Sequence, residues 1–152
     1  MGLMEMASGR SLWRGYDYYK SGNVLSFAKV SEIEYTGVLQ GNENRKYEVW
    51  INTEHPRQSH CNCPHANGKR VICKHQIALY FSAFPRAAEK YYQEVVAYEE
   101  EEERRQEELD RKVTAYIRSL SKEELRETLY EVLYDSEDWV FERFVREHIE
   151  DF

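Results

Sequence analysis

The three cysteines of this 152-residue chain all fall within thirteen positions, and a histidine follows two residues after the last of them. The pattern is Cys61-x-Cys63, nine intervening residues, and then Cys73-x-His75. An odd number of cysteines cannot close fully into disulfides, and clustered thiols are typical of metal binding. Three thiolates and one imidazole form a closed ligand set for structural zinc. We therefore predict one structural Zn²⁺ bound by these four side chains.

The spacing within each pair suits this role. Residues two apart in an extended segment project to the same side, so Cys61 and Cys63 can bind the ion together. Cys73 and His75 stand where a helical pattern begins, and the partial positive charge of a helix N-terminus favours a thiolate over a thiol. Four protein ligands leave no position for water, so the predicted zinc is structural and not catalytic.

Other interpretations compete with this prediction. Buried cysteines can serve simply as small apolar residues. The first two cysteines could form a redox pair, although thiol oxidoreductases use C-x-x-C. His60 and His65 lie in the same loop and are alternative ligands, His65 being the stronger of the two. The other histidines, His55 and His148, are expected to be surface or core residues without a special role.

The periodicity around the cluster predicts an α+β fold. Residues 9–21 place apolar side chains three to four apart, as in a helix. Apolar side chains alternate over residues 24–52, which predicts three or four half-buried antiparallel strands. Residues 53–72 show no period and form a loop that carries the first two ligands. The helical pattern returns at Cys73, and Pro85 is expected to end or bend that helix.

The second half of the chain is predicted to be helical. Residues 86–120 form one charged helix, whose middle lacks apolar residues and carries Glu–Arg and Glu–Lys pairs four residues apart. A capping box beginning at Ser121 starts a helix over residues 122–134. A last helix, capped at Asp135 or Ser136, is expected to complete an antiparallel pair.

Charge divides the chain into dissimilar parts. Residues 1–85 contain ten Lys/Arg and seven Asp/Glu, a net charge of +3, whereas residues 86–152 contain eleven and twenty-one, a net charge of −10. We predict a zinc module over residues 1–85, a charged helix or linker over residues 86–120 and a C-terminal helical pair over residues 121–152. No apolar run approaches the ~18 residues of a membrane span, and the N-terminus lacks a secretory pattern. We therefore expect no membrane association and a cytoplasmic protein, or a nuclear one in a eukaryote.

The cysteine pattern, with Pro64 after the second cysteine and Lys74 before the histidine, resembles the SWIM zinc finger. The tyrosine-rich residues 15–24 and the strand around Tyr47 are similar to the segments that precede the finger in prokaryotic SWIM proteins. The resemblance covers about residues 10–84. It implies a binding module for DNA, for protein or for both, as found beside Swi/Snf-type ATPases, in transposases and in partners of RecA-family recombinases.

The first functional hypothesis is a protein-interaction adaptor, placed among DNA-transaction complexes by family analogy alone. The zinc module would form a rigid platform, and the acidic helices would dock a protein partner. The C-terminal aromatic residues Trp139, Phe141 and Phe144 are expected to lie mainly in a core, with a partner groove as the alternative. Neither a phosphate-binding loop nor a Ser/His/Asp spacing occurs, so we expect no enzymatic activity and no small-molecule substrate.

The second hypothesis is direct DNA or RNA binding by the zinc module, through phosphate contacts and one stacking ring. The residues assigned to that role are Arg57, Lys69, Arg70, Lys74 and Trp50. Lys69 and Arg70 are more simply explained as ordinary charged residues of a surface loop. Because the acidic half would repel phosphate, binding by the chain alone is expected to be weak.

Overall fold

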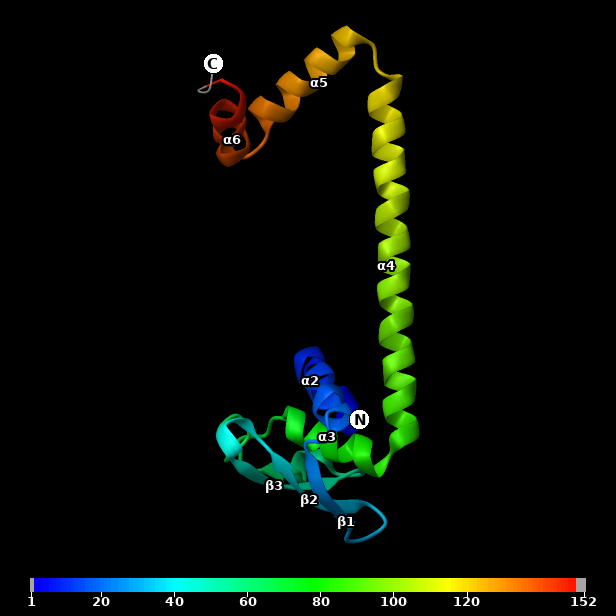
Figure 1. Ribbon diagram of the computed structural model, residues 1–152, viewed down its shortest axis with the longest axis vertical. Helices are drawn as coiled ribbons and strands as arrows, with labels where there is room; N and C mark the ends of the chain where they lie inside the picture. Colours follow the sequence, from blue (N-terminus) through cyan, green and yellow to red (C-terminus); the bar gives the residue numbers. More distant parts are fainter. Residues whose placement is uncertain (1, 150–152) are drawn as a thin grey trace. The chain divides into compact units, whose positions relative to one another are not determined.

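The computed structural model describes residues 2–149 (Figure 1). Contacts within the chain divide it into two compact units, Met1–Ala97 and Tyr98–Phe152. The boundary falls within the long helix α4 (Pro85–Ser119). N-terminal helices, a small antiparallel sheet, a Cys/His loop and further helices follow one another along the chain, which confirms the predicted α+β class.

The first unit holds the sheet and the predicted ligands. Its elements are α1 (Leu3–Met6), α2 (Gly9–Lys20), β1 (Val24–Lys29), β2 (Glu34–Gln40), η1 (Asn42–Asn44), β3 (Lys46–Asn52), η2 (Pro56–Gln58), β4 (His60–Cys61), α3 (Lys74–Ala83) and the start of α4. The strands follow chain order across the sheet, and all neighbours are antiparallel. The segment 53–72, expected to be a loop, thus contains η2 and the two-residue β4, which is too short to show a period.

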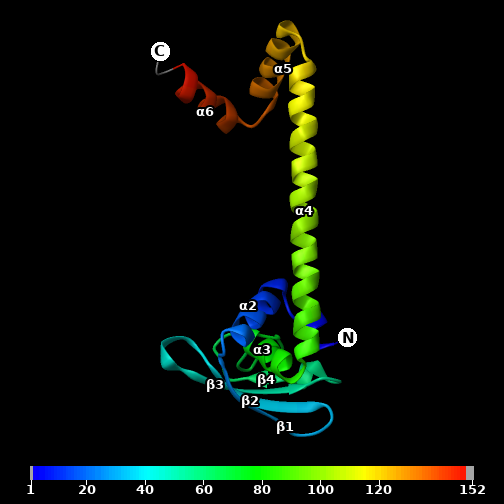
Figure 2. The same cartoon turned by 45° about the vertical axis from the view of Figure 1, so that its right-hand side comes forward.

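Helix α3 occupies the middle of the first unit. It covers one face of the sheet, and α2 lies on its other side (Figure 2). A helix between two layers is apolar on several sides and shows no single stripe. Its buried residues include Ile77, Ala78, Leu79 and Phe81, and the sheet contributes Tyr35, Leu39, Val49 and Ile51 to the same core.

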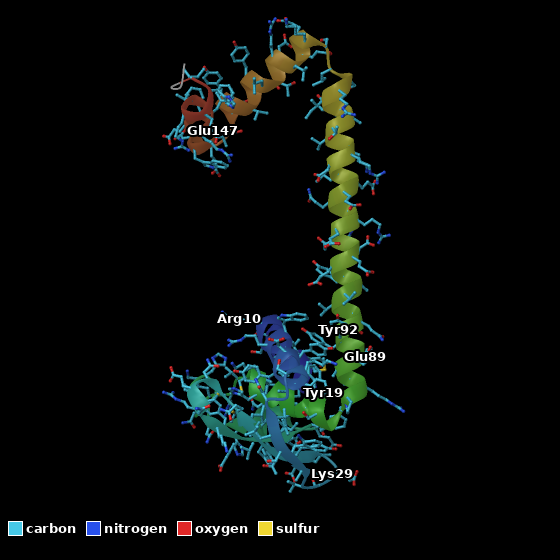
Figure 3. All side chains as sticks on the ribbon, in the orientation of Figure 1. Arg10, Tyr19, Lys29, Glu89, Tyr92 and Glu147 are labelled. Carbon is cyan, nitrogen blue, oxygen red and sulfur yellow. The ribbon has the colours of Figure 1, made fainter. Side chains whose placement is uncertain are left out.

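The start of α4 belongs to this core. Helix α3 ends at Ala83 and α4 begins at Pro85, as predicted, because proline lacks the N–H that would continue the first helix. Tyr92 of α4, labelled in Figure 3, stacks on Tyr16 of α2, with ring centroids 5.2 Å apart and planes at 8°. Ala88, in the second turn of α4, is buried. Aromatic contacts therefore attach the first turns of α4 to α2 and α3.

The close contact between α2 and α3 depends on Gly15. A Cβ atom at this position would lie 2.5 Å from Ile77 Cβ and 3.0 Å from the Lys74 carbonyl oxygen. Real Cβ atoms do not approach a neighbouring side chain so closely, and most of the α3 side chains are buried. Any larger side chain at this position must push the two helices apart.

We predict that Gly15→Ala destabilises the first unit by about 1–3 kcal/mol, because overpacking outweighs the roughly 1 kcal/mol gain in helix propensity. Gly9→Ala is the matched control, since no atom lies within 4 Å of the Cβ built there. Urea unfolding followed by near-UV circular dichroism compares the two variants. Equal midpoints for Gly15→Ala and the unsubstituted chain would contradict the packing described.

The second unit consists of the rest of α4 with α5 (Lys122–Asp135) and α6 (Asp138–His148). The predicted capping box is present, since Ser121 N donates to Glu124 Oε2 at 2.8 Å and Glu124 N donates to Ser121 Oγ at 3.3 Å. The cap of α6 differs from the prediction: it is Glu137, because Asp135 still belongs to α5 and Ser136 is the C-cap of that helix.

The predicted core of the C-terminal helices is largely missing. Leu133 is the one buried hydrophobic residue among the described residues 98–149. Trp139 is 58% exposed and Phe141 is 37% exposed, while Phe144 is half-buried. The expectation that these aromatic residues lie mainly in a core is therefore wrong, because the two short helices contact each other too little to cover them. None of the helices over residues 2–149 combines the length and the apolar character needed to cross a membrane.

Candidate metal centre

The four predicted ligands come from the edge of the sheet and the start of α3. Cys61 lies in β4, opposite Val49 of β3. Asn62 holds the segment against the same strand, because its Oδ1 accepts from Glu48 N at 3.0 Å and its own N donates to the Glu48 carbonyl at 3.3 Å. Cys63 follows, and its carbonyl accepts from the backbone of the next turn. This pairing fixes the segment between the two cysteines, with Cys61 in the strand as predicted and Cys63 in the bend that follows it.

The second pair of ligands marks the beginning of α3. Cys73 is the N-cap, with an extended backbone, and His75 lies in the first turn. Gln76 completes a capping box, since the Cys73 N–H donates to its Oε1 at 2.7 Å in a buried position. The helix therefore starts at a ligand, where its N-terminal N–H groups favour a thiolate.

The ligand atoms are arranged as zinc requires. The three sulfurs and one ring nitrogen all lie within 4.8 Å of one another, and all four residues are buried. His75 Nδ1 is 3.8 Å from both Cys61 Sγ and Cys73 Sγ. A tetrahedral centre with Zn–S of 2.3 Å and Zn–N of 2.0–2.1 Å places sulfur and nitrogen about 3.6 Å apart. The donor set fits one structural zinc, with Nδ1 as the nitrogen ligand.

Two tyrosine rings hold the His75 imidazole. Its centroid lies 4.7 Å from that of Tyr47 and 5.4 Å from that of Tyr18. The Nε2 atom is buried and has no hydrogen-bond partner among the residues that the structure describes. Since Nδ1 faces the sulfurs, aromatic packing takes the orienting role that a carboxylate or carbonyl plays in many metal sites.

Three thiols in one buried cluster do not ionise alike. Hydrogen bonds from Cys61 and Cys73 lower the pKa of Cys63, and the hydrogen bond to Cys63 strongly raises the pKa of Cys61. At Cys73 the hydrogen bond with Cys61 lowers the pKa, but the hydrogen bond with Cys63 and burial outweigh it and raise the pKa to about 11. Without a cation the folded cluster therefore holds one thiolate and two thiols.

The alternative histidine ligands lie outside this group. His60 is exposed in β4, next to Cys61, so its side chain points to the opposite face of the sheet. There it stacks on Trp50, with centroids 5.2 Å apart. His65 is also exposed, although it lines a cavity that reaches Cys63.

The five residues assigned to nucleic-acid contacts do not share one surface hollow. Trp50 lines a hollow on the outer face of the sheet, whereas Lys74 lines a cavity beside the zinc ligands. Arg57, Lys69 and Arg70 are exposed and line neither.

Two basic residues from α2 line the cavity with Lys74, and the sequence reasoning missed both. They are Arg10 and Arg14, one helical turn apart. The sequence feature that indicates them is their spacing of one helical turn on the polar face of the first helix. Because α3 lies some sixty residues further along the chain, only the packing of α2 on α3 reveals that they meet Lys74.

Comparison with known proteins supports the assignment of the loop. A family model described as the SWIM zinc finger matches residues 47–84, from β3 through α3, and this segment includes all four ligands. No curated protein and no solved structure matches the chain. Residues 47–84 are thus similar to a SWIM zinc finger, and Cys61, Cys63, Cys73 and His75 within them form a cluster that fits one structural zinc.

Proposed function

We propose that this chain is a non-enzymatic adaptor, in which the zinc unit forms a rigid body and the helices of the second unit bind another protein. The observation that carries the proposal is the exposure of large apolar side chains on those helices. The large hydrophobic side chains that are at least 37% exposed in the second unit are Tyr98, Leu109, Val113, Tyr116, Ile117, Leu125, Leu129, Tyr130, Val132, Tyr134, Trp139, Phe141 and Ile149.

These residues follow helical spacing. Leu109, Val113 and Tyr116 recur at three and four residues along α4, and Leu125, Leu129 and Val132 do the same along α5. Such stripes are typical of helices that bury one face against another element. Exposed apolar surface beyond a few hundred Å² usually marks an interaction site. A protein partner supplies the cover that these helices lack.

Charge indicates what kind of partner fits. Residues 98–152 contain nine Lys/Arg and nineteen Asp/Glu, a net charge of −10. A second copy would bring the same charge to the interface, so repulsion opposes self-association. The partner that fits is a different protein with an apolar groove and a basic rim. A closed set of four protein ligands leaves the zinc without an open position, which supports a non-catalytic role.

The family resemblance suggests the setting. SWIM fingers occur in proteins that act on DNA, and by this analogy alone we place the adaptor in such complexes. Recognition of nucleic acid through the five residues first assigned to it has less support, since they line no common hollow.

The test is co-purification. The tagged full chain is expressed in the organism that encodes it, and the lysate is treated with nuclease before the chain is purified. The variant Leu125→Glu/Leu129→Glu/Val132→Glu disrupts the apolar stripe of α5. Its matched control, Arg126→Ala/Glu127→Ala/Glu131→Ala, changes exposed residues on the same helix. We expect one protein to co-purify in near-stoichiometric amount with the unsubstituted chain and the control, but not with the stripe variant.

Reconstitution from the two purified proteins must then reproduce the complex, and its affinity should fall with salt because opposite charges meet. If all three forms of the chain behave alike, the stripe is not the docking surface. If light scattering shows a stable dimer of the purified chain, the apolar faces cover each other and the adaptor proposal fails.

A further inference from the structure

A cavity of about 290 Å³ opens beside the zinc ligands and is lined by basic side chains from two helices. Arg10 and Arg14 come from one face of α2, and Lys74 is the first residue of α3. Figure 3 labels Arg10 near the start of α2. Within residues 2–149 no Asp or Glu lines the cavity, and none of these three cations forms an ion pair. Their positive charge is therefore not balanced by any carboxylate of the described chain.

Two further donors are fixed in the wall of the cavity. Lys74 is half-buried, and its Nζ donates to the Tyr18 hydroxyl at 2.6 Å, which holds the ammonium group in place. Ser11 is only 9% exposed, and its Oγ accepts from Ser8 Oγ at 3.1 Å. Among the residues that the structure describes, no atom accepts the Ser11 hydroxyl proton. Because buried hydroxyls normally donate, this proton is a donor without an acceptor beside three cations.

The charge balance indicates which anion fits. Zn²⁺ with three thiolates and one neutral imidazole carries a net charge of −1. Arg10, Arg14 and Lys74 together carry +3, so the region keeps a net charge of +2 when the metal is bound. A phosphate monoester carries about −1.5 to −2 at pH 7 and nearly neutralises this charge, whereas a carboxylate or a phosphodiester brings a single negative charge. Guanidinium groups also match two phosphate oxygens at once.

The shape of the surface favours a peptide as the carrier of that phosphate. The cavity continues into a second hollow of about 220 Å³, which shares Arg14 and Lys74 with it and has room for a neighbouring residue. The tyrosines of this hollow are already packed, since the Tyr18 and Tyr47 rings lie 5.4 and 4.7 Å from the His75 ring. These rings are not available to stack on a base, and a phosphodiester backbone matches the charge less well.

We propose that this cavity binds the phosphoserine or phosphothreonine side chain of a protein, with the phosphate oxygens held by the three cations and the Ser11 hydroxyl. Clusters of arginine are a recurrent means of recognising phosphorylated segments. The inference rests on the adaptor function, because an adaptor joins two proteins and the helices of the second unit bind one of them. The site lies wholly within the first unit and uses no residue of the apolar stripes.

The test uses the zinc-loaded full chain at about 150 mM salt, where diffuse charge attraction is already screened. An array of peptides with phosphoserine or phosphothreonine between randomised flanks is compared with the same array without phosphate. The peptide retained best is then measured by fluorescence anisotropy, together with its unphosphorylated form, its form with glutamate in place of the phosphorylated residue, and single-stranded DNA.

Two variants and one control separate the site from general charge. Arg10→Ala/Arg14→Ala removes both guanidinium groups. Ser11→Ala removes only the hydroxyl, because the Ser11 backbone N–H still donates to Ser8 Oγ and keeps the cap of α2. The control, Lys20→Ala/Lys46→Ala, removes two charges from exposed positions of the same unit that line neither hollow. Zinc content and near-UV circular dichroism confirm that each variant keeps its fold.

We expect the phosphopeptide to bind at least about tenfold more tightly than the unphosphorylated and glutamate forms. The arginine variant should lose about tenfold or more in affinity and Ser11→Ala about three- to tenfold, since hydrogen bonds to a charged group are lost, while the control stays within about twofold. Retention of no phosphopeptide, equal retention on both arrays, equal losses in the arginine variant and the control, or DNA binding as tight as the phosphopeptide would overturn the site. The result does not depend on the partner of the second unit, because only the purified chain and peptides are used.

Discussion

Removing the zinc ion is expected to unfold the first unit. The ion joins β4 to the first turn of α3, and α3 contributes to the core on both its faces. Without metal, three sulfurs and an imidazole are buried together with one charge among them. Zinc binding contributes about 10–16 kcal/mol in zinc-finger peptides, against a total stability of about 5–15 kcal/mol for a typical domain. Loss of zinc therefore removes a free energy about as large as the whole folding stability of the unit.

Cys73→Ser, His75→Ala or a strong chelator should each abolish the near-UV circular dichroism that the buried tyrosines produce. His65→Ala is the matched control, since His65 is exposed and lies outside the ligand group. The far-UV signal of α5 and α6 should survive, because neither helix supplies a ligand. A metal-free chain with an unchanged near-UV spectrum and melting temperature would contradict this prediction.

Zinc affinity is expected to rise steeply with pH, and the slope reports the state of the metal-free chain. If the unit unfolds without metal, three ordinary thiols with pKa values of about 8.5 must lose their protons on binding, so affinity rises about 1000-fold per pH unit near pH 7. In a folded metal-free cluster Cys63 is already ionised, because its pKa is lowered, while the pKa values of Cys61 and Cys73 are raised. Only two protons then leave, and the slope is about 100-fold per pH unit.

Zinc affinity rises with pH in both cases, because zinc binding releases protons and a higher pH favours their release. Competition with a chromophoric chelator of known proton affinity, from about pH 7 to pH 8, measures the slope while ordinary histidines stay largely neutral. We predict a slope near three at the lower end of this range. A constant slope of two would show that the unit stays folded without its ion, and a pH-independent affinity would rule out thiolate ligation.

Much of the first unit could be predicted because its helices, strands and ligand pairs depend on residues that are close together in the sequence. Two alternating runs predicted β2 and β3, and the C-x-C and C-x-H spacings predicted which atoms meet. The pairing of Asn62 with β3, which fixes the segment between the first two cysteines, involves a side chain and a backbone fourteen residues apart and leaves no periodic pattern in the sequence. The same is true of the cavity where Arg10 and Arg14 face Lys74, since it exists only because α2 lies on α3.

The second unit shows a different limit. An amphipathic pattern predicts that a helix will bury one face, but it does not say against what. Trp139 and Phe141 have the spacing and size of core residues, yet both are exposed because α5 and α6 cover little of each other. In the sequence, an apolar stripe that binds another protein has the same pattern as a stripe that packs within the chain.

Zinc K-edge X-ray absorption on the purified full chain identifies the atoms bound to the ion and so tests whether the centre is closed by three sulfurs and one nitrogen. We predict three Zn–S bonds of about 2.3 Å and one Zn–N bond of about 2.0–2.1 Å, with no further ligand. Oxygen from water among the atoms bound to zinc, or fewer than three sulfurs, would show that these four side chains do not form a closed centre. It would point to an open site, and the adaptor proposal would lose its argument against catalysis.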